Sequence, residues 1–270
     1  MSSLEIQKVR DDAIEWALTH GVAFKESLYS AVHTPFTLTP TPISRGDYQH
    51  LKGVAQTLSK LIYAVSEDHG FLYDAIHPIA AGDPFFSALL SMHQHIHSSP
   101  GSAPRLPLLI MRSDFMDDRR NGHQLVEFNG IAAGMGPFGQ RIHELHRYLR
   151  RQWPAISIQE SHQTVAELVC NHAIEGLSAG IAEATFKIKR EFGDPGPARF
   201  LMIVQEHENN VFDQHLLELA LQQRGIETQR RTFRELHNQL STGANDRLIL
   251  NGIGPLDTVY LRAGYQYSDY

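Results

Sequence analysis

The stretch from residue 201 to residue 221 constrains the fold more than any other part of the sequence. Four apolar residues (201–204) lead into a polar run (205–214), and an amphipathic helical pattern begins inside that run at Val211. This order is typical of a buried strand that feeds a helix. In such α/β units ligands bind beyond the carboxyl ends of the strands. The carboxylates and amides of residues 205–214 therefore predict a site for an amino-acid-like ligand, with an ordinary loop and helix cap as the alternative.

The rest of the C-terminal part continues this alternation. A strand is expected at residues 226–231 after the helix at 211–223, and further strands at 248–251 and 258–261. The last of these ends in Arg262, which brings a guanidinium to the same kind of sheet edge. We expect a parallel α/β lobe over residues 196–270, separated from residues 1–195 by the Gly- and Pro-rich linker at 193–197.

The N-terminal part is expected to be mostly helical. Apolar spacing predicts helices at residues 4–19, 44–65, 84–97 and 140–152, with Ser44 as a helix cap. Two strands, at 108–111 and 124–128, should form a β-hairpin because Asn121-Gly122 is a strong turn signal. The fold class is therefore α/β: an α+β N-terminal region with a hairpin, followed by a parallel lobe.

The lobe is expected to be incomplete. A parallel sheet usually has helices on both faces, yet only residues 264–270 follow the final expected strand. We expect apolar surface to be left for another part of a larger catalytic unit to cover.

Composition excludes several function classes. A formal net charge of −6 and a pI near 6.2 argue against a general nucleic-acid binder. The single cysteine, Cys170, cannot form an internal disulfide, which favours a reducing, cytoplasmic setting. The sequence has neither a long apolar run typical of a membrane span nor a signal-peptide core.

Five runs occur in one order along the chain, at residues 34–38, 111–116, 126–129, 205–214 and 260–265. Together they resemble the eukaryotic-type glutathione synthetases, a family of ATP-grasp type. The resemblance implies an ATP-dependent ligase that joins γ-glutamylcysteine to glycine through an acyl phosphate, with Mg²⁺, as a homodimer. It stops at Tyr270, about where the family's second half begins. That half holds much of the ATP apparatus, so we expect it to come from the rest of the gene or another chain.

Glu127 and Asn129 are candidate metal ligands. Residues two apart on a strand point to the same face, and two oxygen ligands suit Mg²⁺, which usually takes few protein ligands. A solvent-exposed strand face is the alternative. The resemblance makes both residues magnesium ligands and places Glu127 near ATP as well.

Arg112 and Arg262 are candidate carboxylate clamps, because a planar guanidinium binds a carboxylate through two hydrogen bonds. Surface salt bridges are the alternative. The resemblance assigns both arginines to the substrate. Animal members of the family carry serine where this chain has Ala132 and Gly134. The other residues that the resemblance assigns to the substrate are Ala132, Ala133, Gly134, Met135, Glu208, Asn209, Asn210, Gln214, Ala263, Gly264 and Tyr265. No catalytic residue is assigned.

Other interpretations compete with this one. The chain could be a non-catalytic binding module or a subunit that needs a partner for ATP chemistry. Residues 134–139 fit G-x-G-x-x-G, with Glu160 further on, as in nicotinamide-dependent oxidoreductases. Against that motif, its first glycine stands well past the strand end, and the strand belongs to an expected hairpin. His93 and His97 could share a helical face, but with 16 histidines in the chain the His93, His95, His97 run is read as a polar helix end.

Overall fold

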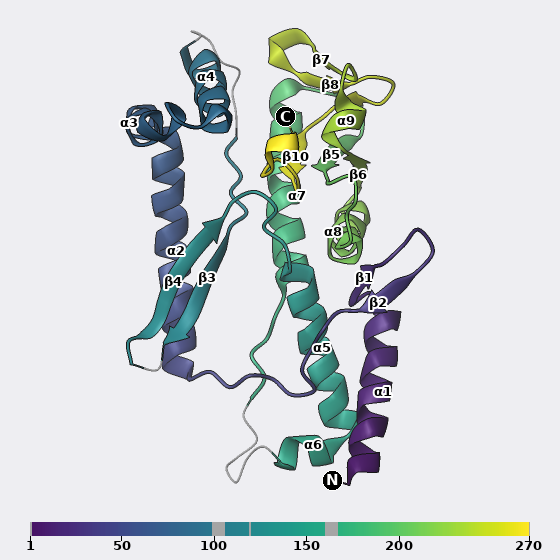
Figure 1. Ribbon diagram of the computed structural model, residues 1–270. Coiled ribbons are helices and arrows are strands. Elements are labelled where there is room, and N and C mark those ends of the chain that lie inside the picture. Colours follow the sequence, from purple (N-terminus) through teal and green to yellow (C-terminus); the bar gives the residue numbers. More distant parts are fainter. Residues whose placement is uncertain (1, 99–105, 119, 160–166, 270) are drawn as a thin grey trace.

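A computed structural model describes residues 2–98, 106–118, 120–159 and 167–269 of the chain (Figure 1). Within these residues, no helix is long and apolar enough to cross a membrane. The predicted class, α/β with a helical N-terminal part, matches the observed mixture of helices and short sheets. Glu160, part of the dinucleotide interpretation, lies outside the described residues.

A three-stranded parallel sheet forms the centre of the C-terminal part. Strand β5 (Ala198–Ile203) lies between β10 (Thr258–Leu261) and β6 (Ile226–Arg231), and both pairings are parallel. Helix α8 (Val211–Gln223) connects β5 to β6, so the predicted strand–helix–strand unit is confirmed. Ladder bonds continue past the strand end, since Arg262 N donates to Ile203 O at 2.8 Å.

Alternate residues of β5 enter two different cores. Phe200 and Met202 pack with α8 and α7 (Ala173–Phe192). Leu201 and Ile203 face the other side, against Leu236, Leu250 and Leu256. That side is covered by helix α9 (Phe233–Leu236) and a small antiparallel sheet of β7 (Leu240–Thr242), β8 (Leu248–Leu250) and β9 (Gly254–Pro255).

The expectation of a bare second sheet face is therefore wrong for the central strand. Both its apolar residues on that side are buried, Leu201 at 0% and Ile203 at 5% exposed. The strand predicted at residues 248–251 is β8, and it pairs with β7 and β9 in this separate antiparallel layer and not in the parallel sheet.

A third core joins the chain's first helix to its middle. Helix α1 (Ser3–Thr19) packs through Val9 and Ala13 against Leu145 and Leu149 of α5. The neighbouring elements are α5 (Gly136–Gln152), α6 (Pro154–Gln159), β1 (Ala23–Lys25) and β2 (Ala31–His33). Strand β1 is tied to the loop before α8, because Lys25 N donates to Asn209 O at 2.8 Å.

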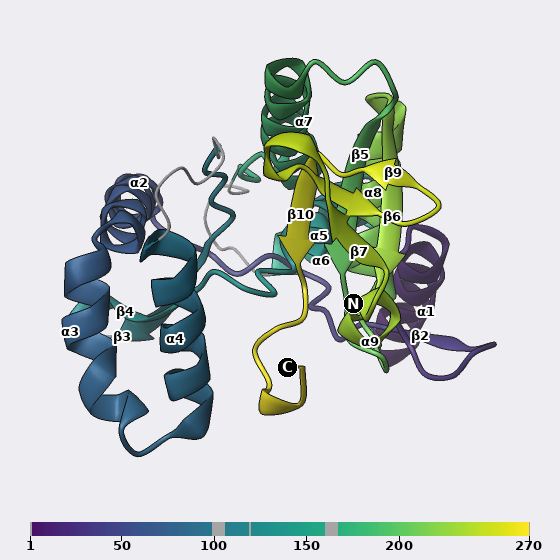
Figure 2. The same cartoon turned by 90° about the horizontal axis from the view of Figure 1, so that it is seen from above.

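Three helices and a hairpin form an arm on one side of the molecule, away from the parallel sheet (Figures 1 and 2). Ser44 caps α2 as predicted, with Asp47 N donating to Ser44 Oγ at 3.0 Å. None of the residues of α2 or α3, all of them described, is buried. The arm consists of α2 (Arg45–Glu67), α3 (His69–Ala80), α4 (Pro84–Ser98), β3 (Arg112–Asp118) and β4 (Gly122–Asn129).

The hairpin forms around the predicted Asn121-Gly122 turn, but its first strand was misplaced. Residues 108–111 are not a strand; β3 begins at Arg112, which pairs with Asn129. The turn sets this register, since pairing starts at Asp118 with Gly122, and a bulge then shifts it between Asp114 and Phe115. The proposed division into residues 1–195 and 196–270 stays a prediction, and α7 packs on β5 across it.

Candidate functional site

The turn at residues 132–135 is fixed to the end of β10. Ala132 N donates to Leu261 O at 2.9 Å, and Tyr260 Oη donates to Ala133 O at 2.8 Å. Burial raises the pKa of Tyr260, so its hydroxyl keeps the proton that it donates. Ala132 and Met135 both have positive φ, 56° and 75°. Such strained non-glycine residues concentrate at functional sites.

Asp213, from the first turn of α8, links this turn to Arg262. Its carboxylate accepts hydrogen bonds from Met135 N and Phe138 N, each at 3.2 Å, and from Arg262 Nη1 at 3.1 Å. The side chain of Asp213 is 0% exposed and that of Arg262 is 6% exposed. Asp213 was not predicted as a site residue. One sequence signal could have indicated its role: Asp213 lies between the candidate residues Asn210 and Gln214, on a helix that has to bury one face.

The same contacts argue against a dinucleotide site at the G-x-G-x-x-G motif. That site would place a pyrophosphate at the N-terminus of α5. Here the Asp213 carboxylate holds two amides of that terminus. The preceding strand β4 belongs to an antiparallel hairpin and not to a βαβ unit.

The absence of a side chain at Gly134 leaves the space that the Arg262 guanidinium occupies. A Cβ atom on Gly134 would lie 2.6 Å from Arg262 Nη2 and 3.1 Å from Cζ. The guanidinium therefore packs directly on the backbone of the turn. A serine at this position, as in the animal members of the resembled family, would require a different placement of the arginine side chain.

Glu208 and Gln214 are brought together in a network that reaches β6. Gln214 Nε2 donates to Glu208 Oε2 at 2.7 Å, and Arg230 Nη1 donates to Gln214 Oε1 at 2.5 Å. Asn210 N donates to Glu208 Oε1 at 2.9 Å. Asn209 is exposed and takes part through its backbone carbonyl.

Three buried atoms in and beside this network stand out: Asn210 Oδ1, Arg230 Nε and Arg262 Nε have no hydrogen-bond partner among the described residues. We call Gly134, Met135, Asn210, Asp213, Gln214, Arg230 and Arg262 the Arg262 cluster. Buried polar atoms are nearly always paired in native proteins, so this cluster has hydrogen-bonding capacity that the chain itself does not use.

The segment after Arg262 forms a carboxylate-binding nest. Gly264 N, Tyr265 N and Gln266 N donate to Asp269 Oδ2 at 2.9, 3.2 and 3.0 Å, and Gln205 Nε2 donates to the same atom at 3.1 Å. The backbone amides of Gly264 and Tyr265, two residues expected to bind a ligand, therefore donate to the chain's own Asp269 carboxylate. Ala263 contributes no side chain to this nest, because it is 1% exposed and packed in the core.

Arg112, Asp114, Glu127 and Asn129 form the hairpin cluster. Arg112 binds Asp114 through two hydrogen bonds, at 2.7 and 2.8 Å, which hold the pKa of Asp114 below its usual range. Asn129 Nδ2 donates to Asp114 Oδ2 at 3.2 Å and to Glu127 Oε1 at 3.3 Å. Glu127 and Asn129 thus share one face, as predicted. Asp114, which was missed, pairs with Glu127 in the hairpin register.

The hairpin cluster has the chemistry of a hard-cation site. It combines two carboxylates and one amide with one guanidinium, so the cluster as a whole carries two negative charges and one positive charge. Oxygen donors of this kind suit Mg²⁺. For Asn129 to add a third oxygen, its amide has to turn, since its nitrogen faces both carboxylates.

The two clusters are close along the chain but separate in their contacts. Gly134 follows Asn129 by five positions, which span at most about 18 Å. Arg112 and Arg262 have different carboxylate partners, Asp114 and Asp213. The prediction that both arginines clamp one dipeptide stays a prediction.

Two cavities lie near these elements. One of about 450 Å³ is lined by Gly130, Ile131, Tyr260 and Leu261, which flank the 132–135 turn. A larger one of about 890 Å³ lies between the loop at residues 38–43, α5 and residues 167–172. None of the predicted site residues lines the larger of these two cavities, so that cavity and the predicted site residues are at different places.

Comparison of the sequence with known proteins shows to which protein family the chain belongs. Residues 3–243 match the model of the eukaryotic glutathione synthase, ATP binding domain. The chain is 29% identical to glutathione synthetase of Homo sapiens over 98% of this chain and 55% of that protein. It is 29% identical to the chloroplastic glutathione synthetase of Solanum lycopersicum over 98% of this chain and 48% of that protein. The chain thus spans about half the length of the curated relatives it matches.

The fold has a solved counterpart. A glutathione synthetase-like effector from Globodera pallida, solved in its apo form, superposes with a TM-score of 0.74 at 18% identity. The match covers 98% of this chain and 59% of that one. At this identity the likeness concerns the fold alone, and it agrees with the match of the family model. This chain belongs to the eukaryotic glutathione synthase family.

Proposed function

We propose that this chain binds γ-glutamylcysteine at the Arg262 cluster and the magnesium of MgATP at the hairpin cluster, within a ligase that joins the dipeptide to glycine. The observation that carries the proposal is the unused hydrogen-bonding capacity of Asn210 Oδ1, Arg230 Nε and Arg262 Nε. Orphaned buried groups in a native structure call for a water, ion or ligand that is not part of the chain. Family membership narrows that ligand to a dipeptide.

Groups in the Arg262 cluster and directly beside it suit the two ends of such a dipeptide. A substrate carboxylate fits the backbone donors of residues 264–266, provided that it displaces the Asp269 carboxylate. A substrate ammonium fits Glu208, whose two oxygens each have a further lone pair, together with Asn210 Oδ1. Recognition of this kind is charge-assisted and therefore stronger than hydrogen bonding between neutral groups.

Glu127, Asn129 and Asp114 are proposed to hold the magnesium ion. When bound, Mg²⁺ would offset the charge of the ATP phosphates during phosphoryl transfer. Asp114 is well prepared for this role, because the hydrogen bonds from Arg112 lower its pKa and keep it ionised at neutral pH.

The proposed reaction has two steps. An oxygen of the cysteinyl carboxylate attacks the γ-phosphorus of ATP, forming an acyl phosphate and releasing ADP. The glycine amine then attacks the acyl carbon; the new C–N bond forms, phosphate leaves with the C–O electron pair, and the amine loses a proton. Residues of this chain would position the dipeptide and exclude water while the first bond forms.

A second candidate, a binding module without ligase activity, is favoured by one observation. The guanidinium of Arg112, the cation of the hairpin cluster, is already paired with Asp114. The cluster carries an excess of negative charge, which attracts a metal ion and repels bare phosphate. Phosphate binding would then depend on cations outside this cluster.

Two measurements on wild type and Glu127→Gln separate these candidates: calorimetric binding of γ-glutamylcysteine to this chain, and ADP formation with MgATP, γ-glutamylcysteine and glycine when this chain is assayed together with the second half that the resemblance assigns to the ATP apparatus. A ligase forms ADP only when the dipeptide is present, and Glu127→Gln lowers that rate at least about tenfold while dipeptide affinity is kept. Glu183→Gln on the exposed side of α7 is the matched control. Dipeptide binding without ADP would indicate the binding module, and absence of dipeptide binding would refute both.

A further inference from the structure

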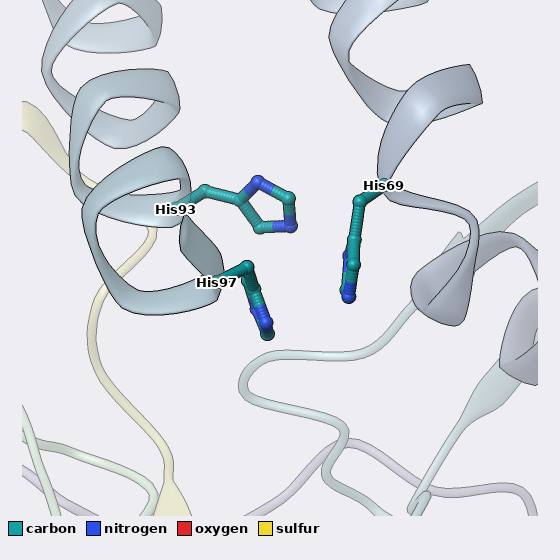
Figure 3. Close-up of side chains that lie close together, drawn as sticks. All are labelled: His69, His93 and His97. Carbon is teal, nitrogen blue, oxygen red and sulfur yellow. The ribbon is translucent and has the colours of Figure 1, made fainter. Parts of the chain in front are cut away.

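Three histidines from two helices meet inside the arm. His69 is the first residue of α3, and His93 and His97 lie one turn apart on α4. Their side chains point into the space between the two helices (Figure 3). One ligand nitrogen from each lies within 4.8 Å of the other two. This is the kind of grouping that holds a metal ion, and its members are all half-buried.

The rings are arranged so that small rotations would complete a site. The centroids of His69 and His97 are 3.9 Å apart in a stacked pair, and those of His93 and His97 are 4.5 Å apart. Nitrogens bound tetrahedrally to zinc at about 2.05 Å are about 3.4 Å apart. The ligand atoms therefore need to approach by roughly 1.4 Å at most, a change that side-chain rotation can supply.

His69 gives independent evidence for a missing partner. Its Nδ1 atom is buried and has no hydrogen-bond partner among the described residues. A buried imidazole nitrogen without a partner loses its hydrogen bond to water and gains none in return, which destabilises the fold. A metal ion between the helices would provide that partner.

The arm also lacks the core that normally joins helices. No residue of α2 or α3 is buried, and large apolar side chains stay exposed there and on α4, such as Phe71 at 55% and Met92 at 47%. Small units that cannot bury a sufficient core are commonly held together by a structural metal.

We propose that His69, His93 and His97 bind a divalent transition metal of the zinc type, which ties α3 to α4 and leaves its fourth position to water. Neutral imidazoles suit zinc, copper and nickel, whereas Mg²⁺ requires oxygen ligands. The site is therefore chemically distinct from the hairpin cluster. Reading the histidine run as a polar helix end left out His69, which lies on another helix and is brought close only by the fold.

The test is a titration of the whole chain with Zn²⁺ by calorimetry, together with thermal unfolding with and without the metal. We expect one tight equivalent and a higher Tm with Zn²⁺. Changes in residues that merely support a metal ligand weaken binding about 10- to 100-fold, so loss of a ligand itself in His69→Gln should weaken it at least about 100-fold. His95→Gln, on the exposed side of α4, is the matched control and should bind like wild type.

Two results would overturn the site: unchanged zinc affinity in His69→Gln, which would mean adventitious binding by other histidines, or no tight equivalent in wild type. Should His69→Gln lose helical content, His97→Gln and the Co²⁺ absorption spectrum decide instead, since a tetrahedral Co²⁺ spectrum in wild type has to disappear in His97→Gln and persist in His95→Gln. No substrate is present in these measurements, so their outcome is independent of the proposed ligase function.

Discussion

At the scale of single residues, the buried pair of Asp213 and Arg262 organises the candidate site. The Asp213 carboxylate accepts hydrogen bonds from two backbone amides, one in the 132–135 turn and one at the start of α5. It also accepts a hydrogen bond from the Arg262 guanidinium. Both side chains are nearly inaccessible. Arg262 therefore fixes the geometry of the turn at least as much as it offers charge to a ligand.

The first prediction is that Arg262→Ala destabilises the fold as well as affecting binding. Removal of one partner of a buried ion pair costs about 3–5 kcal/mol, because the other charge stays buried. Urea unfolding measures this loss. Arg45→Ala, at a highly exposed ion pair, should stay within about 0.5 kcal/mol.

The double variant Arg262→Ala/Asp213→Asn tests whether the unpaired Asp213 carboxylate causes the loss of stability. It should recover part of the stability that Arg262→Ala loses, because the unpaired carboxylate is then neutral. If Arg262→Ala is as mild as Arg45→Ala, the buried pair does not organise this turn.

A second residue-scale prediction concerns Gly134→Ser, which introduces the residue type that the resemblance gives for animal members of the family. Its Cβ would meet Arg262 Nη2 at 2.6 Å, and overpacking of this kind costs about 1–3 kcal/mol. We expect a lower Tm for Gly134→Ser than for Gly130→Ser, where a Cβ meets nothing within 4 Å. Equal melting temperatures would show that Arg262 moves aside freely.

The sequence predicted some of these residues and could not predict others. Glu127 and Asn129 do share a face, as their two-residue spacing required. Asp114 was missed because its pairing with Glu127 depends on a bulge in the hairpin. The role of Asp213 depends on partners at residues 135, 138 and 262, and no local pattern reveals such distant contacts.

At the scale of elements, Glu218 joins α8 to β6. Its carboxylate accepts hydrogen bonds from Arg230 at 2.9 Å and contacts His215 at 2.7 Å. Burial raises the pKa of Glu218, but the hydrogen bonds from His215 and Arg230 outweigh burial, and the pKa lies below its usual range. This group therefore stabilises the fold in its ionised form.

The third prediction follows from that pKa. A depressed folded-state pKa gives stability that is present above the unfolded-state pKa of about 4.3 and is lost as the pH falls through the folded value. Glu218→Gln should lower the free energy of unfolding at pH 7 by about 1–3 kcal/mol. The difference from wild type should shrink below about pH 4, as measured by urea unfolding across pH 3–7. A difference that stays constant with pH would contradict the assignment.

Helices and strands whose bounds follow from a local sequence pattern were predicted well, and those that depend on other contacts were not. The bounds of α8, β6 and β10 follow from local apolar patterns, and they were predicted to the residue. The first hairpin strand was misplaced because residues 108–111 are apolar yet unpaired. Helix α3 was not predicted; it contains Pro78, a residue that normally interrupts helices.

At the scale of the whole molecule, the chain divides into a well-packed part and an arm. The parallel sheet has a core on each face, built entirely from this chain. The arm has exposed apolar side chains and no buried residue in α2 or α3. Local stability should differ between these parts, because it follows the density of buried contacts.

The fourth prediction is that amides of α2 and α3 exchange with solvent faster than those of β5 and α8. Hydrogen exchange followed by mass spectrometry measures this in the free chain. Similar protection in all four elements would mean that the arm is held by contacts other than those described. Zn²⁺ should slow exchange in α3 and α4 if the histidine cluster binds it.

The same method, applied with γ-glutamylcysteine, tests the central claim that the dipeptide binds at the Arg262 cluster. We predict slower exchange in three segments at once: residues 132–139, 205–214 and 262–267. These are distant in sequence and meet at Asp213 and Arg262. Protection confined to residues 38–43 and 167–172, which line the cavity of about 890 Å³, or no protection at saturating dipeptide, would contradict it.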